Sequence, residues 1–159
     1  MLFRSMTSST TYETFTAEEI VVMLEDLGYW ACAHEDDAHR CIVRSRCDGI
    51  AWRAELIGQP PFHSGIRLKV PLLVGGDPLT WVNQWNLTRF SQAFAPADTA
   101  TGDFLRDEDG LVWVNVESLI LFESGVTVAH VNACLSRWIE DVIHIHSIPE
   151  VSYFEELPK

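Results

Sequence analysis

Residue types that commonly bind metal ions occur in three short segments of the sequence. His144 and His146 are two residues apart, the segment 34–39 holds two histidines and three acids, and Asp107–Gly110 is an acidic turn. Residues two apart on a helix point roughly 200° apart, which separates the two imidazoles. The glycine of the acidic turn comes too early for a calcium loop, and no glutamate follows at the twelfth position. We therefore predict no metal site and interpret 34–39 as a solvated loop.

Motifs for catalysis or phosphate binding are also missing from the sequence. It contains no G-x-S-x-G nucleophile elbow, no P-loop and no G-x-G-x-x-G segment. Gly75-Gly76 precedes a predicted helix, where a phosphate could bind, but Asp77 adds negative charge and Pro78 removes an N–H donor. The sequence thus predicts a non-enzymatic protein with no cofactor. The alternative is a small-ligand-binding protein or an enzyme whose site is assembled from distant residues.

Positively charged residues are concentrated on one face of three predicted adjacent strands, 40–47, 50–57 and 65–74. This basic face holds five of the 11 Lys and Arg residues of a chain whose net charge is −12. Its members are Arg44, Arg46, Arg53, Arg67 and Lys69. Like charges opposite each other, such as Arg44 and Arg53, are destabilising unless something neutralises them. Two interpretations stay open: a solvated face with Glu55 as partial partner, or a docking surface for an acidic partner or a carboxylate-rich segment.

Two tryptophans form a second candidate contact site. Trp81 and Trp85 are four residues apart on a predicted helix, so their side chains adjoin. If Trp81 lies outside the stripe that faces the core, it is an anchor candidate for a partner or a second subunit.

The overall composition limits the classes of function. The 159 residues fit one domain, and 47% are apolar, which is enough for a sizeable core. Only 11 basic residues stand against 23 acids, so we predict no nucleic-acid or anionic-membrane binding. No segment approaches the roughly 20 apolar residues of a membrane span, and the first ten residues do not resemble a signal peptide. None of the four cysteines forms a C-x-x-C pair, which favours free thiols in the cytoplasm.

Local signals predict the elements that position these residues. Thr16 and Glu19 form a capping box for a helix over 17–27. Asp48-Gly49 predicts a two-residue type I′ hairpin between 40–47 and 50–57, in which paired positions sum to 97. One face then carries Val43, Ser45 and Trp52 toward the core, and the other carries the arginines.

The remaining signals extend the pattern to the end of the chain. A strand is expected at 65–74, and Pro71 indicates that it lies at a sheet edge or ends there. A helix capped by Asp77 runs to about 87 with Leu79, Val82 and Trp85 facing inward, and strands follow at 89–95 and 111–122. Thr127 caps a last helix with an apolar seam at spacings of 3 and 4. The seam consists of Val128, Val131, Leu135, Trp138, Val142 and Ile145.

One stretch resembles a known family. Residues 81–86, Trp-Val-Asn-Gln-Trp-Asn, followed by Arg89-Phe90, resemble the signature of the YbjN family of bacterial sensory transduction regulators. Two further segments agree with the family pattern: Leu27-Gly28-Tyr29 at the end of the first helix and Ser124–Thr127 before the last one. The resemblance covers about residues 16–145. The insertion at 96–102 and the acidic turn at 107–109 depart from the family pattern and leave the strand pairing of 96–110 open.

The resemblance implies a fold and a mode of action. It implies an α+β fold like that of type III secretion chaperones, an antiparallel sheet flanked by helices in the order α-β-β-β(-β)-α-β-β-α. It also implies a homodimeric regulatory or chaperone-like adaptor that binds segments of partner proteins, without catalytic residues. We accordingly expect a disordered segment at 1–15, one domain at 16–147 and a C-terminal tail at 148–159.

Overall fold

The computed structural model describes residues 6, 7 and 9–158 and has an α+β fold, as predicted. Its helices are α1 (Ala17–Asp26), α2 (Pro78–Thr88), α3 (Val128–His144) and the short 3₁₀ helix η1 (Ile145–Ser147). The strands are β1 (Thr11–Tyr12), β2 (Ala31–Glu35), β3 (Cys41–Cys47), β4 (Ile50–Ile57), β5 (Gly65–Val74), β6 (Gln92–Phe94), β7 (Val112–Leu121), β8 (Val126–Thr127) and β9 (Val151–Tyr153).

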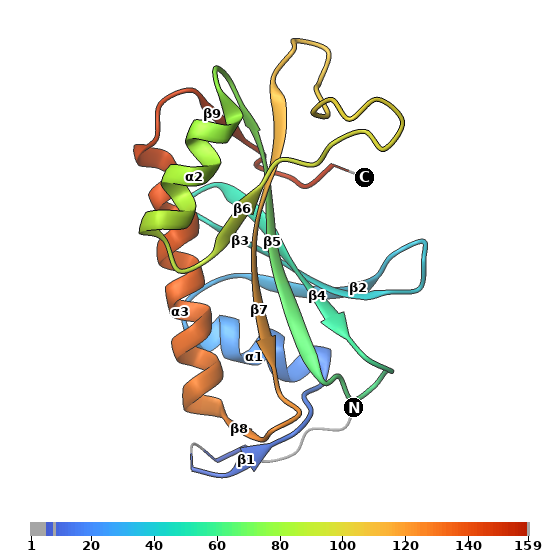
Figure 1. Cartoon of the computed structure of the whole chain (residues 1–159). Helices are drawn as coiled ribbons and strands as arrows, with labels where there is room; N and C mark the ends of the chain where they lie inside the picture. The colour runs from blue at the N-terminus through green and yellow to red at the C-terminus, as the bar shows by residue number, and fades with distance from the viewer. Residues whose placement is uncertain (1–5, 8, 159) are drawn as a thin grey trace.

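The molecule consists of one curved antiparallel sheet with helices on one side (Figure 1). The strand order is β2-β3-β4-β5-β7-β6, and β9 pairs with β5 outside this path. Helices α1, α2 and α3 lie on the same side of the sheet, so none of the described residues places a helix over its other side (Figure 1). We call this other side the open face. The short strands β1 and β8 form a separate pair at one end.

The predicted helix signals are confirmed. Thr16 accepts a hydrogen bond from the Glu19 backbone N–H, and the Glu19 carboxylate accepts one from the Thr16 backbone N–H, which completes the capping box of α1. Asp77 caps α2 by accepting from the Leu79 backbone N–H, and Thr127 caps α3 by accepting from that of His130, in both cases without the reciprocal bond of a capping box. The seam of α3 faces the sheet, because its members from Val131 to Ile145 are buried.

The predicted β3–β4 hairpin is also confirmed in its register. Cys47 pairs with Ile50 and Ser45 with Trp52, so paired positions sum to 97. Asp48 and Gly49 have φ values of 48° and 80°, both in the left-handed region that a type I′ turn requires. The register places Trp52 in the core and keeps the arginines on the open face.

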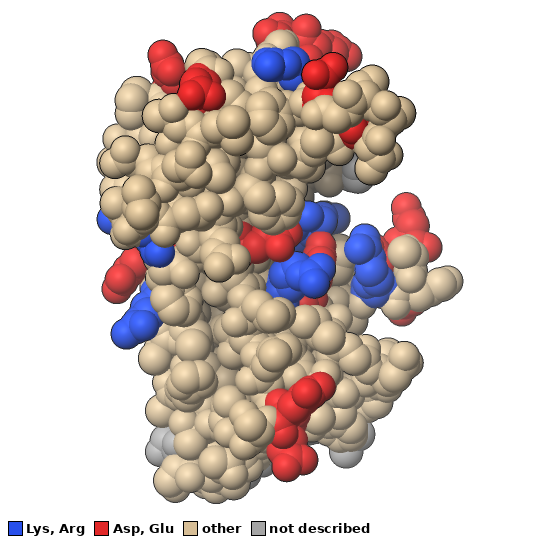
Figure 2. All heavy atoms as spheres, viewed as in Figure 1, with Lys and Arg blue, Asp and Glu red and all other residues tan. Residues whose placement is uncertain are grey.

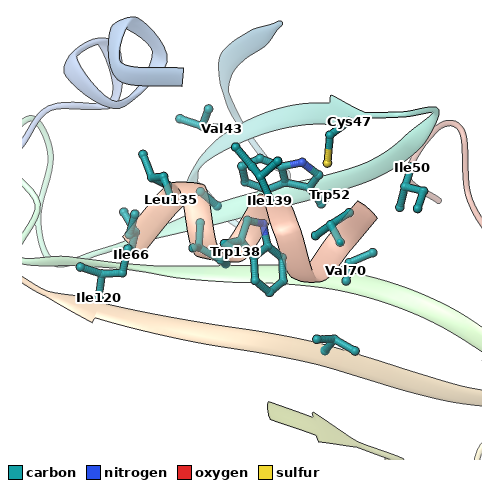
Figure 3. Packing of buried hydrophobic residues seen from close by; sticks show 14 of the residues in the cluster. Val43, Cys47, Ile50, Trp52, Ile66, Val70, Ile120, Leu135, Trp138 and Ile139 are labelled. Atoms are coloured by element: carbon teal, nitrogen blue, oxygen red, sulfur yellow. The ribbon is translucent and has the colours of Figure 1, made fainter. Parts of the chain in front are cut away.

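The core fills the space between the sheet and α3. Trp52 from β4 and Trp138 from α3 are both fully buried, and their rings meet edge-on with centroids 5.9 Å apart (Figure 3). Such aromatic pairs contribute about 0.5–1.5 kcal/mol beyond the area that they bury. Leu135 and Ile139 extend this contact along α3, so the longest helix is anchored to the centre of the sheet.

Two expectations from the sequence are wrong. β5 is an internal strand between β4 and β7 and continues past Pro71 to Val74, although Pro71 indicated a sheet edge or the end of the strand. The proline is accommodated because β4 pairs with β5 only as far as Lys69 and β9 only from Leu72, which leaves a gap beside Pro71. Leu79 does not face inward: it lies in the first turn of α2 and is 52% exposed.

Described residues near both ends of the chain form regular structure that the sequence did not indicate. The expected disordered segment 1–15 includes residues 1–5 and 8, which lie outside the described residues. Within it, β1 pairs with β8, and the buried Phe15 exchanges two backbone hydrogen bonds with His63. The expected tail at 148–159 contains β9, which pairs with β5. Ordered structure therefore extends beyond 16–147 at both ends.

Replacing the buried indole of α3 tests the account of the core. We expect Trp138→Ala to lower the free energy of unfolding by about 3–5 kcal/mol, because it leaves a cavity against Trp52. Trp30→Ala is the matched control, since Trp30 is 61% exposed, and its effect should stay within about 0.5 kcal/mol. Urea denaturation followed by circular dichroism measures both, and equal losses would contradict this packing.

Candidate functional site

The structure brings the five cations of the basic face together on the open face. Arg44 and Arg46 come from β3, Arg53 from β4, and Arg67 and Lys69 from β5. Arg44 lies opposite Arg53, which in turn lies opposite Lys69. In Figure 2, Lys and Arg side chains gather at the middle of the molecule, where its surface is hollowed.

Carboxylates from the same face neutralise three of these cations. Arg53 forms an ion pair with Glu55 at 2.8 Å, and Arg67 approaches the other Glu55 oxygen at 3.9 Å. Lys69 lies 3.6 Å from Glu117 of β7. This arrangement explains how the sheet tolerates like charges in neighbouring strands. It also confirms Glu55 as the partial partner expected from the sequence.

Arg44 and Arg46 differ from the other three cations. Both are exposed, and neither forms an ion pair with a carboxylate among the described residues. They line a hollow of about 340 Å³ together with the exposed side chain of Trp30. Trp30 precedes β2 and was not singled out from the sequence, since a single tryptophan before a strand gives no local signal of exposure. The part of the basic face that is free to bind an anion is therefore the Arg44–Arg46 end.

The tryptophan pair lies elsewhere, on α2 in the helical layer. The rings of Trp81 and Trp85 stack with centroids 5.2 Å apart and an interplanar angle of 18°. Trp85 is buried and Trp81 is half-buried. Together with Gln84, His144 and Ser147 they line a hollow of about 490 Å³ between α2 and the end of α3. The structure thus does not join the tryptophans to the arginines in one site.

His144 is a titratable group beside the tryptophan pair. Its ring centroid lies 6.2 Å from that of Trp85. Burial, followed by the charge of Arg89, lowers the pKa of His144, so the imidazole is neutral near pH 7. Ser147 Oγ donates to the His144 carbonyl at 2.7 Å and lies 3.1 Å from Nδ1, so it accepts from a protonated Nδ1. That tautomer leaves Nε2 as a hydrogen-bond acceptor.

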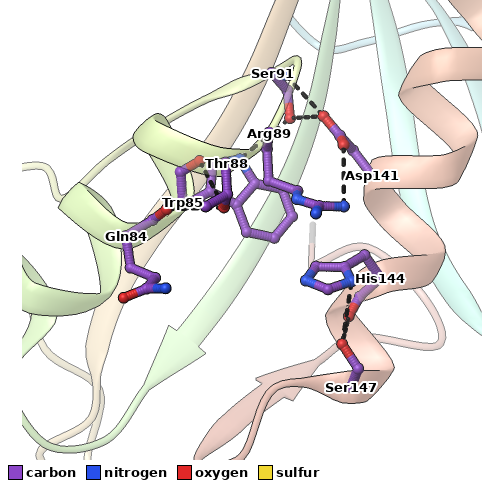
Figure 4. A network of polar contacts seen from close by, with 8 residues as sticks. All are labelled: Gln84, Trp85, Thr88, Arg89, Ser91, Asp141, His144 and Ser147. Carbon is purple, nitrogen blue, oxygen red and sulfur yellow. Dashed lines mark hydrogen bonds and ion pairs between the residues drawn. The ribbon is translucent and has the colours of Figure 1, made fainter.

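A buried carboxylate ties α3 to the chain between α2 and β6. Asp141 Oδ2 accepts hydrogen bonds from the backbone N–H of Ser91 at 2.7 Å and from its hydroxyl at 2.6 Å (Figure 4). Trp85 Nε1–H donates to Ser91 Oγ at 3.2 Å, and Arg89 Nη1 lies 4.0 Å from Asp141 Oδ1. Because donors already occupy this carboxylate, its geometry is that of a structural contact rather than of a general base.

The segments with metal-binding residue types have other roles in the structure. Asp36 accepts backbone hydrogen bonds from Ala38 and Arg40 and forms an ion pair with the Arg40 guanidinium. The Arg40 backbone and side-chain hydrogen bonds lower the pKa of Asp36. Asp107 accepts backbone hydrogen bonds from Asp109 and Leu111 and so closes the acidic turn. Across residues 6, 7 and 9–158, no three His, Cys, Asp or Glu side chains are placed to share a metal ion.

The four cysteines are free thiols. Burial raises the pKa of Cys47 to about 12, which keeps this thiol protonated and unreactive beside Trp52.

In the part of the chain that the structure describes, no helix combines the length and apolar character that a membrane crossing requires.

Comparison with known proteins found no family model that matches the chain, and no curated protein or solved structure with significant similarity. The YbjN resemblance and the chaperone-like fold therefore stay predictions. The structure does give one motif residue a role. Asn86 on α2 exchanges two hydrogen bonds with the backbone of Ala93, at 2.7 and 3.0 Å, and so fixes β6 against the helix.

Neutralising Asp141 tests the structural role of this carboxylate. We expect Asp141→Asn to lower the free energy of unfolding by about 1–3 kcal/mol, since a buried amide group replaces an acceptor that holds two Ser91 donors. Glu140→Gln is the matched control, because Glu140 is the exposed neighbour and loses the same charge. Urea denaturation at neutral pH measures both, and an unchanged midpoint for Asp141→Asn would refute this role.

Proposed function

We propose that the protein is a non-enzymatic regulatory or chaperone-like adaptor that binds extended protein segments as a homodimer. In this proposal its fold is of the type III secretion chaperone kind and it acts in the cytoplasm, where the four free thiols stay reduced. The observation that carries the proposal is the open face: the described part of the chain places no helix over it, and at one end it presents Arg44 and Arg46 beside the exposed Trp30.

The charges of this surface select the chemistry of the partner. Guanidinium groups bind carboxylates through paired hydrogen bonds, and aromatic side chains supply apolar contact area. The chain as a whole is strongly acidic, with a net charge of −12, so surfaces away from the basic face repel anionic partners. An extended segment with acidic and apolar residues therefore fits the Arg44–Arg46 end, whereas the long anionic backbone of a duplex does not fit the molecule as a whole.

The outer edge of β7 supports the homodimer. β6 pairs only with Asn115–Glu117, so the described residues place no strand beside 118–121. Leu119 and Leu121 in this stretch are 54% and 51% exposed. An exposed, apolar strand edge is a template for pairing with another strand. Two copies that pair here about a two-fold axis would join their open faces into one continuous surface.

A second candidate function, binding of a small molecule, is favoured by the hollow between α2 and α3. It has a volume of about 490 Å³, and it offers the stacked Trp81–Trp85 pair and the acceptor Nε2 of the neutral His144. This volume is within the range of ligand sites. The nearby Asp141 is already engaged by Ser91, and Ser147 Oγ donates to the His144 carbonyl rather than to its imidazole, so His144 does not activate this hydroxyl as a nucleophile in the observed arrangement.

Peptide binding tests the adaptor proposal. We expect a fluorescent probe peptide of alternating glutamate and valine to bind the native chain with micromolar affinity, and its lysine counterpart not to bind. Arg44→Glu should weaken the binding by about tenfold or more, because it replaces a free guanidinium by a repelling charge. Arg137→Glu on α3 makes the same charge change in the helical layer and should leave the affinity unchanged. Fluorescence anisotropy measures all four, and equal binding of both peptides would refute the proposal.

Sedimentation tests the dimer and its surface. At micromolar concentration we expect twice the monomer mass of 18.0 kDa. Leu119→Lys combined with Leu121→Lys should give monomers, because lysines on a strand edge oppose pairing. Leu87→Lys is the control, since Leu87 is 86% exposed on α2, and it should stay dimeric. A native chain that sediments as a monomer would exclude the dimer, and a dimer that survives the double substitution would place its interface elsewhere.

A further inference from the structure

The C-terminal segment enters the sheet where two strands separate. β4 pairs with β5 from Gly65 to Lys69, and β9 pairs with β5 from Leu72 to Val74 on the same side. Immediately after β9, the Phe154 carbonyl accepts a hydrogen bond of 2.7 Å from the Ala51 backbone N–H of β4. The segment is therefore held between β4 and β5 by backbone hydrogen bonds.

Beyond this point the chain continues over the open face (Figure 1). The ring of Phe154 stacks on that of Trp113, with centroids 5.5 Å apart and an interplanar angle of 9°. Trp113 lies on β7 four residues before Glu117, and alternation along the strand places both on the open face. The aromatic side chain of the segment is thus docked on the surface that we propose for partner binding.

The acidic residues that follow lie in the same hollow as the free arginines. Glu155, Glu156 and Leu157 line the same hollow of about 340 Å³ as Trp30, Arg44 and Arg46. The charges of the two sides are opposite. Neither glutamate forms an ion pair with an arginine within the described part of the chain, and both are exposed. The segment thus lies over the site while it leaves the guanidinium groups able to bind another carboxylate.

We propose that Phe154–Leu157 is a built-in, displaceable occupant of the Arg44–Arg46 site. This inference rests on the proposed function and names its partner: an extended protein segment in which an aromatic residue is followed by two acids and an apolar residue. Phe154 marks the aromatic position of such a segment, Glu155 and Glu156 the acidic positions and Leu157 the apolar one. A partner segment of this pattern binds by displacing the chain's own copy.

Occupation by a tethered segment sets the affinity that a partner experiences. A short tether gives the segment an effective concentration in the millimolar range, so even weak internal binding competes with a free partner. The apparent affinity of the partner falls in proportion to the fraction of molecules whose site is open. Weakening the internal contact alone therefore strengthens partner binding, which a purely structural role of the segment does not explain.

Charge reversal in the segment tests this inference. The probe is a fluorescent peptide, Ser-Tyr-Phe-Glu-Glu-Leu, which copies residues 152–157. We expect Glu155→Lys combined with Glu156→Lys to bind it about tenfold more tightly than the native chain in fluorescence anisotropy. The matched control is Glu13→Lys combined with Glu123→Lys, which changes the net charge equally at exposed positions near β1 and β8 and should show no comparable gain.

A second pair of measurements separates the inference from the proposed function. Glu155→Gln with Glu156→Gln should give a smaller gain in the same direction, and it keeps the test valid if charge reversal disturbs folding. Adding Arg44→Glu to either variant should abolish the gain. If the native chain binds the probe but neither variant binds it more tightly than the control, the built-in occupant is overturned while the adaptor proposal stands. If the probe binds to none of these proteins, both proposals are overturned.

Discussion

The two-residue turn at Asp48-Gly49 determines which side chains of β3 and β4 face the helices. Because side chains alternate along a strand, a slip of one residue would exchange the two faces of this hairpin. Trp52 would then leave its contact with Trp138, and Arg53 and Glu55 would enter the core in its place. Taking these charged groups out of water is far more costly than any contact that the slipped register could gain. The division into an apolar side under α3 and a charged open face follows from this constraint.

The open face then has to accommodate cations in three neighbouring strands. Glu55 and Glu117 neutralise Arg53, Arg67 and Lys69 inside the sheet. At the other end the chain provides the glutamates of its own C-terminal segment, which line the same hollow as Arg44 and Arg46 without forming ion pairs. The first arrangement stabilises the fold, whereas the second leaves binding capacity for a partner. This difference makes the Arg44–Arg46 end of the open face the proposed binding site for a partner.

Elements set by nearby residues could be predicted from the sequence, and contacts between distant segments could not. Three local features are confirmed: the capping box of α1, the register of the β3–β4 hairpin and the apolar seam of α3. Each is set by a pattern within one continuous segment of the sequence. The contact between Asp141 and Ser91 joins positions 50 residues apart, and no local pattern indicates it. β9 was not predicted, because three residues give too short a pattern to indicate a strand. It forms by pairing with Leu72–Val74 of β5, beyond the part of β5 that pairs with β4. The basic face was predicted, but the C-terminal segment beside it was not.

Amide hydrogen exchange of the native chain, read by mass spectrometry with and without the Ser-Tyr-Phe-Glu-Glu-Leu peptide, tests the central claim most directly. A partner that displaces the C-terminal segment exposes its amides, so the account predicts faster exchange at 154–157 when the peptide is bound. The same experiment should show slower exchange around Trp30 and β3. Unchanged exchange at 154–157 with slowing confined to α2 and the end of α3 would contradict the account and place the binding site at the tryptophan pair.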